Sequence, residues 1–166
     1  MAFDMSKIGI KKNIPSVNFT DYSGVFQAEP KWGKTTTASK FPNSIIIPFE
    51  KGVKGAVANV VENINTWEDF IGFVDSLVEN REEIGNDIST IVFDTVNSAY
   101  EIITPYVLKY CSRVDGTVYK TIADTMVGKS NFWVERDKLF KLQLDRILGL
   151  GFSILFLTHL QVKTIK

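Results

Sequence analysis

The stretch "AEPKWGKTTT", residues 28–37, decides the fold. It matches the pattern Gly/Ala-x-x-x-x-Gly-Lys-Ser/Thr, in which backbone N–H groups wrap around phosphate oxygens. Ala28 stands where glycine is usual, but this position only turns the chain out of a strand and tolerates a small side chain. Gly33, Lys34 and Thr35 are the residues expected to approach phosphate and metal, and all three are intact. A chance match in a chain of this length arises in about one per cent of cases.

Each position of the loop has an expected role. Lys34 reaches the phosphate oxygens, the Thr35 hydroxyl ligates Mg²⁺, and Gly33 lets the main chain come close. The predicted nucleotide-binding residues are Ala28, Glu29, Pro30, Lys31, Trp32, Gly33, Lys34, Thr35 and Thr36. The alternative for the stretch is a lysine-rich surface turn.

Strands and helices are predicted to alternate on both sides of this loop. The expected strands are 22–28, 44–50, 89–94 and 152–159, and three of them are continuous apolar runs typical of strands buried on both faces. The expected helices are 34–41, 66–78, 96–110 (disturbed by Pro105) and 131–150, with 111–131 as a loop. The alternation predicts a three-layer α/β fold, with a mainly parallel sheet and helices on both faces.

Two of the expected helices have apolar faces that the sequence identifies. The first begins with a capping box at Thr66–Asp69. Its apolar residues recur at helical spacing: Trp67, Phe70, Ile71, Val74, Leu77 and Val78. The apolar side predicted for 131–150 consists of Trp133, Phe140, Leu144, Ile147 and Leu148.

Three polar residues follow buried strands at what should be one edge of the sheet. Asp94 is expected to orient the Mg²⁺ shell through water, and Glu50 to orient and deprotonate the attacking water. His159, the chain's one histidine, is placed to sense the γ-phosphate. The alternatives are a helix N-cap for Asp94, an exposed acid for Glu50 and a structural histidine for His159.

The phosphate-binding loop, Glu50, Asp94 and His159, in the order expected for such proteins, resemble the RecA-like P-loop ATPase core. The likeness extends to phage-encoded single-domain AAA or RecA-core proteins associated with single-strand annealing recombination, over about residues 22–162. It implies Lys34, Glu50 and His159 as catalytic residues, and Thr35 and Asp94 at the metal. It also implies homo-oligomers, as rings or filaments, with ATP between subunits, and single-stranded DNA as a partner.

Two features depart from that pattern. Trp32 precedes the loop glycine where small residues are usual, and the chain stops at Lys166, soon after the strand that His159 closes. Because the chain stops there, we expect the core at 22–166 to be incomplete at its C-terminus. The polar residues 1–21 are expected to form an N-terminal arm. The loop 111–131, with Arg113, Lys120 and Lys129, occupies the place of the first DNA loop; the alternative is an ordinary surface loop.

Composition narrows the function further. Nineteen basic and nineteen acidic residues among 166 give a net charge of zero. This balance argues against strong binding of nucleic acid by these residues, because contacts to phosphate need an excess of positive charge. The single cysteine, Cys111, excludes an internal disulfide or a cysteine zinc cluster. No apolar run approaches the roughly 20 residues needed to span a bilayer, and no signal peptide is recognisable, so we expect a cytoplasmic protein without a membrane partner.

Together these features predict a Mg²⁺-dependent ATPase of phage DNA recombination or replication. ATP is expected because no guanine-specific N-K-x-D motif is present. A small-molecule kinase and a non-catalytic module whose assembly is gated by nucleotide are the alternatives.

Overall fold

The computed structural model describes residues 15–50 and 57–160. Within these ranges one sheet contains β1 (Gly24–Ala28), β2 (Ser44–Pro48), β3 (Asn59–Val60), β4 (Thr90–Asp94) and β5 (Ser153–His159). The strand order is β1-β5-β4-β2-β3, and every pair is parallel. All five residues of β4 are buried, as expected for a central strand covered on both faces.

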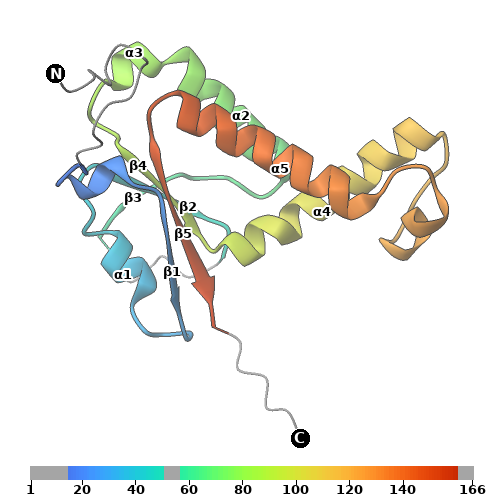
Figure 1. Ribbon diagram of the computed structural model, residues 1–166, viewed down its shortest axis with the longest axis horizontal. Coiled ribbons are helices and arrows are strands. Elements are labelled where there is room, and N and C mark those ends of the chain that lie inside the picture. Colours follow the sequence, from blue (N-terminus) through green and yellow to red (C-terminus); the bar gives the residue numbers. More distant parts are fainter. Residues whose placement is uncertain (1–14, 51–56, 161–166) are drawn as a thin grey trace, which may run out of the picture.

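Helices cover both faces of this sheet (Figure 1). One face carries α2 (Trp67–Glu79), α4 (Val96–Asp115) and α5 (Phe132–Gly149), whereas the other carries the short α1 (Lys34–Ala38). The remaining helix is α3 (Arg81–Ile84), and short 3-10 turns occupy Phe19–Asp21 and Ala123–Val127. The predicted three-layer α/β architecture is confirmed. Among the described residues, no helix is both long and apolar enough to cross a bilayer.

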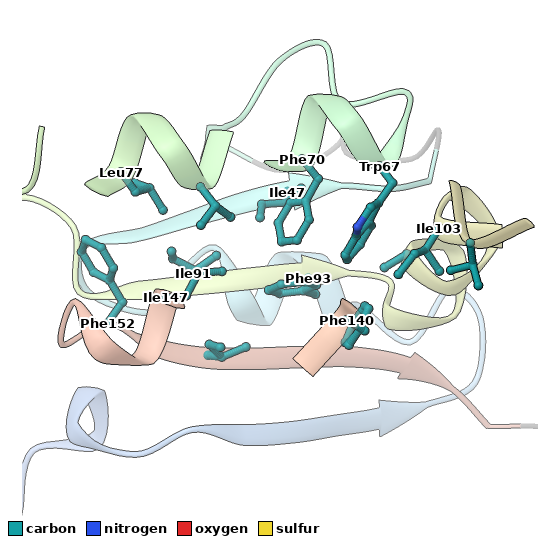
Figure 2. Close-up of a cluster of buried hydrophobic side chains, with 14 of the residues drawn as sticks. Ile47, Trp67, Phe70, Leu77, Ile91, Phe93, Ile103, Phe140, Ile147 and Phe152 are labelled. Atoms are coloured by element: carbon teal, nitrogen blue, oxygen red, sulfur yellow. The ribbon is translucent and has the colours of Figure 1, made fainter. Parts of the chain in front are cut away.

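The larger core lies between the sheet and α2, α4 and α5. Figure 2 shows Trp67 and Phe70 of α2 reaching down onto the sheet, where Phe93 of β4 occupies the centre. The Phe93 ring lies 5.6 Å from that of Phe70 and 5.1 Å from that of Phe156. The predicted capping box that starts α2 is present, because Thr66 accepts from Asp69 N while the Asp69 side chain accepts from Thr66 N.

The prediction for the segment after β4 was wrong in extent. Helix α4 continues through Pro105 to Asp115, five residues beyond the expected end, so the loop starts later than 111. Proline removes one helical hydrogen bond, but Pro105 is exposed, and buried Ile103, Val107 and Cys111 hold both halves of the helix against the core.

The predicted apolar face of α5 was right in part, since Phe140 and Ile147 are buried and Leu144 packs against the core. Trp133 and Leu148 are 47% and 45% exposed. Phe132 and the polar Gln143, which the prediction left out, are buried as well. In α2 the prediction was nearly right, since only Val78 of the expected face is exposed, at 43%. The sequence did not predict β3 or α3, which are only two and four residues long.

The strand register brings the predicted polar residues to one edge. Ala28 of β1 lies beside His159 of β5, and Asp94 of β4 lies beside Pro48 of β2. Glu50 follows two residues after Pro48, and its backbone N–H donates to Asp94 O at 3.2 Å. The carboxyl ends of parallel strands form the usual ligand-binding edge of such sheets. Most of the predicted N-terminal arm, residues 1–14 of 1–21, lies outside the described residues.

Candidate functional site

The loop between β1 and α1 has the backbone that its sequence pattern predicts. Gly33 has a φ of +73°, a left-handed conformation that glycine adopts most readily. Lys31 also has a positive φ, +70°, which is unusual for a residue with a side chain and which sequence analysis did not foresee. Trp32 between them is 71% exposed, so its large side chain points to solvent and leaves the inside of the loop free.

Lys34, the first residue of α1, is held inside the loop and is only 6% exposed. Its ammonium donates to Ala28 O at 3.1 Å and to Glu29 O at 3.0 Å. Its third close partner is His159 Nδ1, at 3.1 Å. A buried ammonium needs acceptors for its N–H groups, and these three contacts supply them.

Thr35 and Asp94 bring two oxygen ligands together from different elements. Thr35 Oγ1 donates to Asp94 Oδ2 at 2.6 Å. Burial raises the pKa of Asp94 above its ordinary value, and the negative charge of Glu50 adds to this rise, while the Thr35 hydrogen bond and the charge of Lys34 oppose it. The carboxylate is thus poorly neutralised by the protein alone, as suits a group that faces a cation.

Glu50 lies at the same edge, within a cluster of donors. Thr95 Oγ1 donates to Glu50 Oε1 at 2.5 Å, and Ser98 Oγ donates to the same oxygen at 3.0 Å. His159 Nε2 lies 3.1 Å from Oε1 and 3.2 Å from Oε2. Partial burial raises the pKa of Glu50, but the hydrogen bonds from Thr95, His159 and Ser98 outweigh it and keep the pKa below its ordinary value.

His159 links Lys34 to Glu50. Because an ammonium can only donate, the Lys34 contact requires Nδ1 of His159 to accept, which leaves the ring proton on Nε2. Nε2–H then donates to the Glu50 carboxylate. The structure therefore connects the loop lysine to the candidate base through one imidazole ring.

Sequence analysis missed three residues of the turn that follows Asp94. Thr95 and Ser98 contact Glu50, and Asn97 Oδ1 accepts from Thr158 Oγ1 at 2.8 Å and from His159 N at 3.4 Å. The only indication in the sequence is the run of hydroxyl and amide side chains directly after the strand-ending acid. Asp94 is not the N-cap of α4, because Thr95 occupies that position.

The structure thus brings Lys34, Thr35, Glu50, Asp94 and His159 into one cluster. The other predicted loop residues take no part in it through their side chains. Glu29 contributes its carbonyl, while Pro30, Lys31, Trp32 and Thr36 are exposed. The basic residues of the predicted DNA loop are elsewhere: Arg113 lies in the last turn of α4, and Lys120 and Lys129 follow it, at the end of the α4–α5 hairpin that projects beyond the sheet (Figure 1).

These residues fit a magnesium–nucleotide complex. A hydroxyl and a carboxylate are hard oxygen ligands, and Mg²⁺ is commonly bound by one or two such groups together with phosphate oxygens. Thr35 and Asp94 would hold the ion, Lys34 and the loop backbone would hold the phosphates, and Glu50 lies beside them.

The parallel sheet and the loop that follows β1 are consistent with the P-loop NTPase fold, whose proteins have a nucleotide-binding, ATPase-type function. Residues 20–166 match the family model described as an AAA domain, and the chain therefore belongs to that family. It is also similar to the SPbeta prophage-derived uncharacterized protein YorG of Bacillus subtilis (strain 168), with 28% identity over 129 residues. The match covers 76% of this chain but only 37% of YorG.

Replacing Asp94 by asparagine is expected to stabilise the nucleotide-free protein. Because the folded-state pKa of Asp94 is raised, folding loses stability as the pH rises above the unfolded-state value of about 3.9. At neutral pH the Asp94→Asn change removes this cost, so we expect the melting temperature to rise by about 2–5 °C. Thermal unfolding without Mg²⁺ or nucleotide measures it. Asp87→Asn, the same change at an exposed site, should leave the temperature unchanged; a lower melting temperature for Asp94→Asn would contradict the electrostatic account.

Proposed function

We propose that this chain is the core of a Mg²⁺-dependent ATPase. The observation that carries the proposal is the connected set of contacts Lys34–His159–Glu50 beside the Thr35–Asp94 pair. It combines a phosphate-binding cation, oxygen ligands for a metal and a candidate base at one sheet edge, as hydrolysis of a nucleoside triphosphate requires.

The residues of the chain have separate roles in this mechanism. Lys34 places a positive charge where negative charge develops on the transferred phosphoryl group. Glu50 orients a water for in-line attack and accepts its proton. His159 reports on the γ-phosphate, since its two ring nitrogens face Lys34 and Glu50. When bound, Mg²⁺ neutralises charge on the phosphate oxygens.

The biological setting that we propose is phage DNA recombination or replication. The similarity to a prophage-derived protein supports the phage origin, and the resemblance to RecA-like cores suggests association with single-stranded DNA, assembly as a homo-oligomer and a place in the cytoplasm of the host. A protein longer than this chain would supply the DNA-binding surface, consistent with the balanced charge of these residues.

ATP turnover by the full-length gene product tests the proposal. We expect phosphate release with Mg²⁺, none with EDTA, and stimulation by single-stranded DNA. Mass spectrometry of the products separates hydrolysis from transfer, because a phosphorylated nucleoside or sugar would indicate a small-molecule kinase instead. ATP binding without turnover would indicate a module in which nucleotide drives assembly alone.

A further inference from the structure

The N-cap and the first turn of α4 place two buried hydroxyl groups within hydrogen-bond distance of Glu50. Thr95 is 1% exposed and Ser98 is 9% exposed. Both donate to Glu50 Oε1, at 2.5 and 3.0 Å. Glu50 follows β2, so these bonds join side chains that are more than forty residues apart in the sequence.

The Thr95 hydroxyl does not cap its own helix, although Thr95 occupies the capping position. Thr95 is the N-cap of α4, where a threonine side chain usually accepts a hydrogen bond from a backbone N–H of the first turn. In the described structure it makes no such bond. Thr66, the N-cap of α2, does make it, accepting from Asp69 N at 3.1 Å. Stabilisation of the helix therefore does not explain the orientation of Thr95, whereas contact with Glu50 does.

The two oxygens of the Glu50 carboxylate contact different numbers of hydrogen-bond donors. Oε1 contacts three donors, from Thr95, Ser98 and His159, and a carboxylate oxygen has about two lone pairs. Oε2 contacts only His159 among the described residues. Oε1 is thus saturated, and Oε2 keeps capacity to accept a hydrogen bond from a water.

We propose that Thr95 and Ser98 are positioning residues that fix the Glu50 carboxylate with Oε2 turned toward the reacting water. The proposal rests on the proposed role of Glu50 as the base. Neither hydroxyl touches a reacting atom; both act through the carboxylate, whose orientation decides how often it faces the water correctly. Small displacements of such a group cost up to about 100-fold in rate.

Steady-state kinetics of Thr95→Val and Thr95→Ser test this role. The valine variant keeps the shape but loses the hydroxyl, so we expect kcat to fall about 10- to 100-fold with the KM for ATP within about twofold. Thr95→Ser restores the hydroxyl and should recover kcat to within about threefold. In a Glu50→Gln background, Thr95→Val should have no further effect, because residues acting through one group are not additive. Thr104→Val, which removes a hydroxyl that donates to the Tyr100 carbonyl of the same helix, should leave kcat unchanged.

A crystal structure of the nucleotide-free Thr95→Val/Ser98→Ala protein gives a readout that does not depend on turnover. We expect the Glu50 carboxylate to leave its position or to occupy several. If wild-type protein fails to hydrolyse ATP, the proposed function fails, yet this structure still decides whether the hydroxyls hold the carboxylate. An unmoved carboxylate, or equal loss of kcat in Thr95→Val and Thr95→Ser, would overturn the inference. If the double variant does not fold, Ser98→Ala alone carries both measurements with the same expected directions.

Discussion

Glu50→Gln should lower the rate of ATP turnover by about 100- to 1000-fold while leaving ATP affinity within a few-fold. The amide has the size of the carboxylate and can still accept from Thr95 and Ser98 through its oxygen. It cannot take a proton from water, and its NH₂ group is a donor facing the donor His159 Nε2–H. Binding should survive because the phosphate contacts come from the loop and Lys34. Single-turnover phosphate release and calorimetric titration with ATP measure the two quantities separately.

The matched control is Glu68→Gln, which makes the same change on the exposed side of α2. It should leave both turnover and binding unchanged. If Glu50→Gln keeps turnover within about threefold of the wild type, Glu50 is not the base, and the site binds nucleotide without the chemistry that we assign to it.

The elements of this site could be predicted because each lies at a strand end that the sequence marks. "IIIPFE", "TIVFD" and "FLTH" each combine an apolar run with a polar ending, and "GKTT" follows a shorter strand. In a parallel sheet such endings meet at one edge whatever the strand order. The strand order itself was not predictable, and it matters here. It puts β5 between β1 and β4, which allows His159 to contact both Lys34 and Glu50.

The contacts of Thr95 and Ser98 could not be predicted for a different reason. A threonine at an N-cap predicts a bond to its own helix, which is a local interaction. Only the tertiary placement of Glu50 beside the turn offers a competing acceptor. In the same way, Lys31 was unremarkable in the sequence, since nothing local requires a left-handed residue two positions before Gly33. The loop imposes that conformation.

The error in the face of α5 also has a physical origin. Counting apolar residues selects Trp133, but its ring lies against Arg136, whose Cζ is 4.8 Å from the ring centre, and stays half exposed. The buried face instead includes polar Gln143, whose Oε1 accepts from Arg146 at 2.9 Å. An aromatic residue that can stack on a cation needs less burial, and a polar residue with a partner tolerates more. The spacing of apolar residues in the sequence indicates neither the stacking of Trp133 nor the hydrogen bond of Gln143.

Lys34→Met should abolish detectable turnover and weaken ATP binding at least about 100-fold. The methionine keeps most of the unbranched stem but has no charge and no donors. Hydrogen bonds to charged groups contribute about 1.5–3 kcal/mol each, and two of them to phosphate oxygens correspond to a factor of roughly 100 or more in affinity. Calorimetric titration with Mg²⁺ and ATP measures the loss. Lys40→Met, the same change on an exposed lysine just beyond α1, is the control and should bind ATP normally.

The loss of binding should come without loss of the fold, and this separates a phosphate contact from a structural one. The two carbonyls that Lys34 contacts keep other donors: Ala28 O accepts from Leu160 N at 3.1 Å, and Glu29 O accepts from Trp32 N at 3.4 Å. Removing the ammonium therefore leaves neither oxygen without a partner, and it relieves the cost of a buried charge. We expect the melting temperature without nucleotide to change by less than about 3 °C. An unfolded Lys34→Met protein would show that Lys34 is needed to close the loop itself, and ATP binding within tenfold of the wild type would show that the phosphates are held elsewhere.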